Sequence, residues 1–124
     1  MKHILLVDDD QSMLKFLGRA LCEYHVTSAH DGHEALALAE RMERLDLIIT
    51  DYMMPEMFGD ELIARARERQ PDVQVLVVTG HSQILESIAT PWWEEHSHLE
   101  KPFEVEVLRQ RVSALIGDAH QIEL

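Results

Sequence analysis

Four aspartates stand directly after short apolar runs of this sequence, where their carboxylates could gather around one point. Asp8, Asp9 and Asp10 follow the run ILLV, and Asp51 follows LDLIIT. Carboxylates at this density repel one another unless a divalent cation lies among them. A donor set made only of oxygens suits Mg²⁺, Mn²⁺ or Ca²⁺ rather than zinc. The first chemistry that these residues indicate is therefore the binding of a hard divalent metal ion.

Two further groups stand at the ends of later apolar segments. Thr79 follows VQVLVV, and Lys101 follows SHLE. The lysine ammonium could bind phosphate oxygens, and the threonine hydroxyl could donate a hydrogen bond to the same group. A carboxylate surrounded by a cation, an ammonium and a hydroxyl is suited to accepting a phosphoryl group as an acyl phosphate. Each residue alone is ordinary at a turn or helix start, so the indication comes from their combination.

The segment HSHLEKPF raises a second interpretation, because His96 and His98 are two residues apart among acidic residues. On a strand these imidazoles would share a face and could form half of a metal site. The carboxylates are better ligands for the metal expected here, so we interpret the segment as a strand that presents Lys101. The remaining scattered histidines are expected to be surface or packing residues: His3, His25, His30, His33 and His120.

The elements that must position these groups alternate along the chain. Short apolar or β-branched runs predict strands at 4–7, 25–29, 45–50, 73–78 and 97–100. Apolar residues at helical spacing predict helices that begin near residues 13, 35, 62, 82 and 105. Asp9 or Asp10 can cap the first helix, Asp31-Gly32 is expected to form a turn, and Gly117 is expected to end the last helix. This (βα)₅ order predicts an α/β fold, a parallel sheet between two layers of helices, with its ligand site at the carboxyl ends of the strands.

Composition bounds the class of protein. The chain has 124 residues, of which 46 % are hydrophobic and 27 % charged, as expected for one globular domain. A net charge of −12 disfavours direct binding to nucleic acid or to an anionic membrane. No apolar run approaches the roughly 18 residues of a membrane span, and the single cysteine, Cys22, excludes an intramolecular disulfide. We expect a cytoplasmic location.

Four segments together resemble the receiver domain of bacterial two-component response regulators, a CheY-like family. They are VDDD at 7–10, DYMMP at 51–55 with Gly59 beyond it, VVTGH at 77–81 and LEKPF at 99–103. The resemblance covers nearly the whole chain and implies a flavodoxin-like three-layer sandwich with strand order 2-1-3-4-5. It assigns residues 1–124 to a receiver domain, with 3–117 as the fold proper and 118–124 as a tail.

The resemblance also implies a role for each residue at the strand ends. Asp51 would accept a phosphoryl group from a sensor histidine kinase or phosphotransfer protein. Asp8, Asp9, Asp51 and the backbone carbonyl of Met53 would hold Mg²⁺, or Mn²⁺ in its place, with Asp9 binding directly and Asp8 more through water. Asp10 would start the first helix.

Thr79 would be the switch hydroxyl, and Lys101 would pair with the phosphoryl group, presented by a peptide bond to Pro102 that is often cis in the family. Such a protein catalyses its own phosphorylation and dephosphorylation but is not a turnover enzyme. Its signal would shift the face made by helix 4, strand 5 and helix 5, which would change partner binding and could form a homodimer.

Five residues bear on how this sequence departs from the family pattern. His98 stands where receivers commonly carry Tyr or Phe, and we hypothesise that it makes the output weaker or sensitive to pH. Met53 and His81 flank the path of the attacking water in the family, and a bulky Met53 should slow that attack. Trp92-Trp93 replaces a turn of small residues, and these rings are either a partner anchor or packing residues.

Other functions are weighed by what they require. A phosphohydrolase of the haloacid-dehalogenase type needs an aspartate where Met53 stands, and a flavin or nucleotide binder needs a glycine-rich loop in place of three aspartates. A degenerate receiver that only docks to proteins stays as the alternative. A stand-alone receiver and the first part of a longer regulator are both open.

Overall fold

The computed structural model describes residues 2–51, 57, 59–79 and 97–117. Strands and helices alternate along them as the sequence predicts. The elements are β1 (His3–Val7), α1 (Gln11–Ala20), β2 (His25–Ala29), α2 (Gly32–Arg41), β3 (Leu47–Asp51), α3 (Gly59–Arg69), β4 (Gln74–Thr79), β5 (Ser97–Glu100) and α5 (Val105–Ile116). The short helix expected at 82–90 lies outside the described residues.

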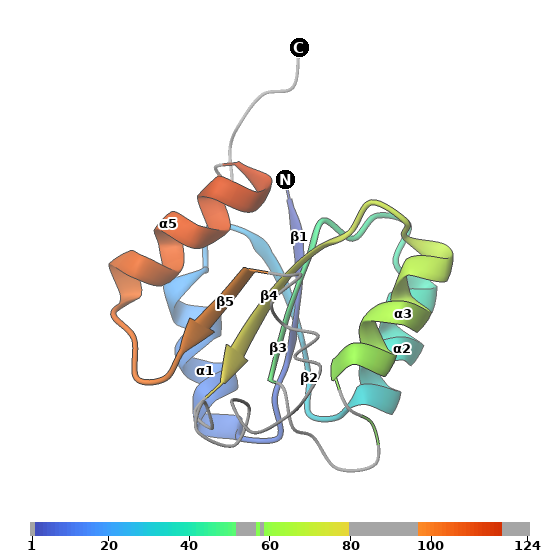
Figure 1. Cartoon of the computed structure of the whole chain (residues 1–124), viewed down its shortest axis with the longest axis horizontal. Coiled ribbons are helices and arrows are strands. Elements are labelled where there is room, and N and C mark those ends of the chain that lie inside the picture. The colour runs from blue at the N-terminus through green and yellow to red at the C-terminus, as the bar shows by residue number, and fades with distance from the viewer. Residues whose placement is uncertain (1, 52–56, 58, 80–96, 118–124) are drawn as a thin grey trace, which may run out of the picture.

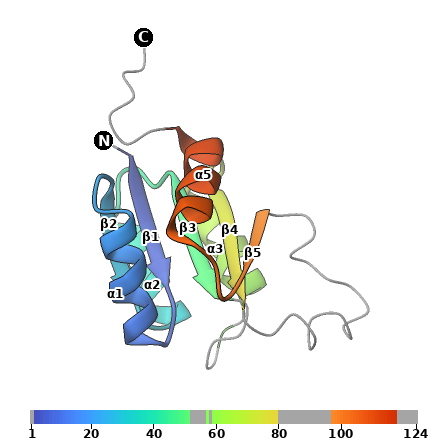
Figure 2. The same cartoon turned by 90° about the vertical axis from the view of Figure 1, so that its left-hand side faces the viewer.

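The five strands form one parallel sheet in the order β2-β1-β3-β4-β5, which confirms the flavodoxin-like arrangement. Figure 2 shows this order from β2 at one edge to β5 at the other. The residues of β1 after His3 and those of β3 are buried throughout, because helices cover both sides of these strands. Their continuous apolar sequence is therefore the expected one for a central parallel strand.

Helices α1 and α5 cover one face of the sheet, and α2 and α3 cover the other (Figure 1). Successive residues of a strand point to opposite faces, so Ile4 and Leu6 pack toward α1 and α5, whereas Leu5 and Val7 pack toward α2 and α3. This produces two apolar cores with the sheet between them. Both cores hold the strands in one register and so fix where each strand ends.

The helix termini are capped by side chains that the sequence only partly identifies. Asp10, rather than Asp9, caps α1, since its Oδ1 accepts the Ser12 N–H at 2.9 Å. Asp31 caps α2 through a 2.7 Å bond from the Glu34 N–H. The prediction of a turn at Asp31-Gly32 is therefore wrong, because Asp31 is the N-cap of α2 and Gly32 is its first residue.

Two strands extend one residue further than the sequence predicts. Asp51 pairs with Val78 as the last residue of β3, and Thr79 pairs with Glu100 as the last residue of β4. Pairing with a neighbouring strand is a tertiary contact, which the apolar pattern of a single segment does not reveal.

Gly117 ends α5, as the sequence predicts. Its φ is 82°, in the left-handed region that glycine tolerates.

Among the helices that the structure describes, none has the length and apolar character that crossing a bilayer requires.

Candidate functional site

The acidic and basic residues singled out in the sequence meet at the carboxyl edge of the sheet, which is the lower edge in Figure 1. Asp8 directly follows β1, Asp51 is the last residue of β3, and Lys101 directly follows β5. Parallel strands end at the same edge, so residues that are 43 and 50 positions apart become neighbours there. The Asp8 N–H also donates to the Ala29 carbonyl at 3.2 Å, which ties this edge to β2.

The Lys101 ammonium lies between two carboxylates. Its Nζ donates to Asp8 Oδ2 at 3.0 Å and contacts Asp51 Oδ2 at 3.5 Å. The Asp8 side chain is 2 % exposed, that of Asp51 10 % and that of Lys101 20 %. Charges this deeply removed from water are stable only when paired, so Lys101 is the counterion of both acids.

The same contacts determine the protonation of Lys101. Burial alone would lower its pKa, but the hydrogen bond to Asp8 and the charges of Asp51 and Asp8 outweigh burial. The net effect raises the pKa of Lys101 above its ordinary value of 10.5. The ammonium therefore stays charged at neutral pH despite its burial.

The carboxylates also satisfy the geometry of a metal site. Asp8, Asp9 and Asp51 each offer an oxygen, and these three oxygens lie within 4.8 Å of one another. Asp8 Oδ1 already accepts the Asp10 N–H at 2.9 Å, and Asp8 Oδ2 accepts from Lys101. Asp9 is exposed, and no described residue donates a hydrogen bond to its carboxylate. The residues present therefore fit a hard divalent ion such as Mg²⁺, with Asp9 the most available direct ligand.

Comparison with known proteins identifies the family of this chain. The family model for the response regulator receiver domain matches residues 4–113. The chain belongs to the response regulator receiver domain family. Receiver domains of two-component systems are phosphoacceptor switches that interact with histidine kinases or phosphotransfer proteins, which agrees with the resemblance found in the sequence.

Individual relatives support the assignment. The chain is 35% identical over 118 residues to the response regulator receiver protein CpdR of Brucella abortus, with 94% of this chain and 98% of the relative covered. It is 38% identical over 112 residues to the transcriptional regulatory protein GlrR of Escherichia coli, with 89% of this chain covered. This chain spans only a quarter of GlrR, since 25% of that relative is covered.

A solved structure of the family bears on the metal. The response regulator protein TrrA of Thermotoga maritima, in complex with Mg²⁺-BeF, superposes with a TM-score of 0.79 at 29% sequence identity. The match covers 93% of this chain and 99% of TrrA. Receiver domains bind Mg²⁺ at an acidic pocket. In this chain the carboxylates of Asp8, Asp9 and Asp51 cluster at the carboxyl edge of the sheet.

The other residues predicted for the receiver site are placed in different ways. Thr79 ends β4 at the same edge, beside Glu100 of β5. The Lys101-Pro102 peptide bond is cis, as the resemblance implied. His98 is exposed on β5, and its backbone carbonyl accepts a hydrogen bond from Arg111 of α5 at 3.1 Å. Met53, His81 and Trp92-Trp93 lie outside the described residues.

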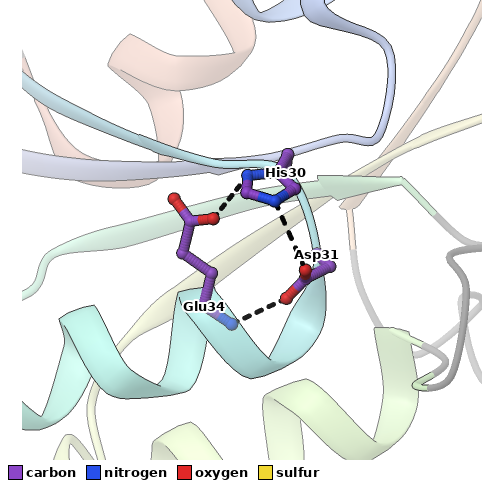
Figure 3. Close-up of side chains that lie close together, drawn as sticks. All are labelled: His30, Asp31 and Glu34. Carbon is purple, nitrogen blue, oxygen red and sulfur yellow. Dashed lines mark hydrogen bonds and ion pairs between the residues drawn. The ribbon is translucent and has the colours of Figure 1, made fainter.

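A second group of potential ligands was missed by sequence reasoning. His30, Asp31 and Glu34 lie together where β2 passes into α2 (Figure 3), and their ligand atoms lie within 4.8 Å of one another. The sequence predicts His30 only as a surface or packing residue. The signal that could have revealed the group is the spacing of four between His30 and Glu34, with an N-cap aspartate between them.

Proposed function

We propose that this receiver domain accepts a phosphoryl group on Asp51 from a sensor histidine kinase or phosphotransfer protein, in the presence of Mg²⁺. The observation that carries the proposal is the position of Lys101, 3.0 Å from Asp8 and 3.5 Å from Asp51 at the edge where β1 and β3 end. An ammonium in this place can face the oxygens of a phosphoryl group on Asp51. We assign the receiver to residues 3–117, since the family match spans 4–113.

We assign Asp8, Asp9, Asp51 and the backbone carbonyl of Met53 as the groups that would hold Mg²⁺, with Mn²⁺ as a substitute. When bound, the ion would neutralise charge on the acceptor carboxylate and on the phosphoryl oxygens. The cluster of Asp8, Asp9 and Asp51 oxygens within 4.8 Å supports this assignment. Asp9, which is exposed, would bind directly, whereas Asp8 would act more through water.

The transfer itself needs one nucleophile from this chain. A carboxylate oxygen of Asp51 attacks phosphorus, the bond from phosphorus to the donor imidazole nitrogen breaks, and the imidazole keeps that electron pair. Lys101 then exchanges its contact with Asp51 Oδ2 for a phosphoryl oxygen while its bond to Asp8 can persist. The Thr79 hydroxyl would donate to the same group, as the switch hydroxyl.

We propose that the signal leaves through the face that contains helix 4, β5 and α5, where partners or a second copy of the receiver would bind. His98 is exposed on β5 and stands in the position of the usual aromatic residue. A change of output or of its pH profile in His98→Tyr would support a role for this imidazole in the switch. We propose the cytoplasm as the location, where the phosphoryl donors of this family are expected.

The test is phosphorylation with a small donor. The wild-type chain, Asp51→Asn and the control Asp72→Asn, which alters an exposed acid, are incubated with acetyl phosphate and Mg²⁺ and analysed by intact mass. We expect one labile phosphoryl group on the wild type and on Asp72→Asn, and none on Asp51→Asn. Dependence on Mg²⁺ is tested by adding a chelator.

The oligomeric state is measured in parallel with beryllofluoride. A wild-type chain that stays unmodified would overturn the proposal and favour the alternative, a degenerate receiver that works as a docking module. Equal modification of Asp51→Asn would show that another residue is the acceptor.

A further inference from the structure

The imidazole of His30 lies between two carboxylates at the junction of β2 and α2 (Figure 3). Its Nδ1 is in close contact with Glu34 Oε2, and its Nε2 lies 3.6 Å from Asp31 Oδ2. Each ring nitrogen therefore faces a different acid. Glu34 Oε2 thus lies against Nδ1, whereas 3.6 Å is too long for a hydrogen bond between Nε2 and Asp31 Oδ2.

The Asp31 carboxylate is fixed by its role in the helix. Its Oδ1 accepts the Glu34 N–H at 2.7 Å as the cap of α2, which leaves Oδ2 directed at the imidazole. The backbone beside His30 is also fixed, because the carbonyl of Ala29 accepts the N–H of Asp8 at 3.2 Å. The Asp31 oxygen and the backbone beside His30 are thus held by the fold, whereas the imidazole itself is 60 % exposed and lies between its two acidic neighbours.

The 3.6 Å distance between Nε2 and Oδ2 matches the spacing of two ligand atoms bound to one metal ion. Zinc binds imidazole nitrogen and carboxylate oxygen at about 2.0–2.2 Å in tetrahedral geometry, which places two ligand atoms roughly 3.3–3.6 Å apart. The Nδ1–H of a metal-bound histidine normally donates to a carboxylate, which orients the ring and strengthens the other nitrogen as a ligand. The Glu34 carboxylate already lies against Nδ1, in the place that such an acceptor takes.

We propose that His30 Nε2 and Asp31 Oδ2 bind one Zn²⁺ ion and that Glu34 is the positioning residue of this site. An imidazole ligand favours zinc over Mg²⁺, so the site differs in metal preference from the acidic pocket of Asp8, Asp9 and Asp51. His30 and Glu34 border a cleft of about 320 Å³. The His30 side chain is 60 % exposed and that of Asp31 34 %, so water can reach both ligands and complete the coordination.

The residues of this site differ from those of the acidic pocket, and the charges around it come from three neighbouring side chains. Asp31 and Glu34 contribute two negative charges, whereas Lys15 of α1 borders the same cleft and opposes a cation. The two carboxylates lie next to the proposed ion, whereas the exposed Lys15 side chain can turn away from it. Attraction by the acids therefore outweighs repulsion by the lysine. Lys15→Gln should therefore tighten zinc binding rather than weaken it.

The first experiment is a calorimetric titration of the full chain with Zn²⁺ in excess Mg²⁺, which occupies the acidic pocket. We expect one zinc site in the wild type, its loss in His30→Ala, and at least a tenfold weakening in Asp31→Asn, where the amide oxygen still caps α2. Glu34→Gln should weaken binding about 10-fold or more, as removal of an orienting carboxylate does. His33→Ala is the matched control, because it removes an exposed histidine of the same helix and should bind zinc as the wild type does.

The second experiment identifies the ligand atom. Long-range proton–nitrogen NMR of the His30 ring should show a zinc-dependent shift of Nε2, while Nδ1 stays protonated. Binding that survives in His30→Ala but disappears in Asp51→Asn would place the ion in the acidic pocket and overturn the proposal. Equal weakening in His33→Ala, or metal on Nδ1, would overturn it as well.

Discussion

Replacing Lys101 by methionine removes the counterion of two buried carboxylates while keeping a side chain of similar length. In the metal-free protein, Asp8 and Asp51 would then face each other without the ammonium that now contacts both, at 3.0 and 3.5 Å. We expect Lys101→Met to lower the free energy of unfolding. We also expect Mg²⁺ to restore most of that loss, because the ion takes over as the counter-charge.

The magnitude follows from the distances and the exposure. With an effective dielectric constant of about 20, a pair at 3.0 Å contributes about 5.5 kcal/mol and a pair at 3.5 Å about 4.7 kcal/mol. Dehydration of the ammonium offsets several kcal/mol of this attraction. Removing one partner of a fully buried pair costs about 3–5 kcal/mol. Lys101 keeps 20 % of its side chain exposed, so we expect a loss of about 2–3 kcal/mol.

The assay is urea unfolding of the wild type and Lys101→Met, each with a chelator and with saturating Mg²⁺. The difference between them should fall from about 2–3 kcal/mol to below about 1 kcal/mol when Mg²⁺ is present. Linkage requires the variant to bind Mg²⁺ more tightly by the recovered amount, which is about tenfold for each 1.4 kcal/mol. Lys15→Met is the matched control, because it neutralises an exposed lysine of α1 and should change neither quantity.

The pH dependence gives the same prediction a second readout. The raised pKa of Lys101 means that the folded protein holds this proton more tightly than the unfolded chain. Its stabilisation is therefore fully present below the ordinary lysine pKa of 10.5 and is lost as pH rises through the higher pKa of the folded protein. The difference between wild type and Lys101→Met should stay constant around neutral pH and shrink in strong alkali. A loss that is the same with and without Mg²⁺ would refute the account of Lys101 as a replaceable counterion.

Three further predictions concern packing, capping and titration. A Cβ on Gly32 would lie 2.8 Å from Met57 Sδ and 2.9 Å from Met57 Cβ, whereas one on Gly18 meets nothing within 4 Å. Thermal unfolding should thus show that Gly32→Ala destabilises by about 1–3 kcal/mol and that Gly18→Ala stabilises by about 0.5–1 kcal/mol. Asp10→Ala should lower stability by about 1 kcal/mol in urea unfolding because α1 loses its cap, while Asp10→Asn should retain most of it. Burial, and then the charge of His25, lower the pKa of His3 although Asp46 opposes them, so the stability linked to His3 is present above about 6.5 and is lost as pH falls. His3→Gln should therefore lose less stability than the wild type between about pH 7 and 5 in urea unfolding, whereas His33→Gln should behave as the wild type does.

The carboxyl edge of the sheet was predictable because two simple regularities fix it. Continuous apolar runs identify strands buried on both faces, and parallel strands must end together. Asp8, Asp51 and Lys101 were therefore expected to converge before any contact was known, and the contacts of Lys101 confirm it. The sheet order came from the family resemblance, since the apolar pattern alone does not say which strands are neighbours.

The zinc candidate was not predictable in the same way, because it depends on where a helix begins. If Asp31-Gly32 formed a turn, nothing would direct the Asp31 carboxylate toward His30. Once Asp31 is the cap of α2, one of its oxygens is held by the Glu34 N–H and the other faces the imidazole. Gly32 is required at that helix start because Met57 fills the space a side chain would need, and this contact is between segments far apart in the sequence.

The two contacts of Lys101 differ in what a phosphoryl group on Asp51 would do to them. The contact with Asp51 Oδ2, at 3.5 Å, is the longer and involves the carboxylate that is modified, so it is the one that must change. The 3.0 Å bond to Asp8 involves an acid that is also held by the Asp10 N–H, so it can stay. Lys101 would then turn about Asp8 as it follows the new charge. Because Lys101 directly follows β5, that movement would act first on the strand that carries His98, which is why this position is the place to look for an altered output.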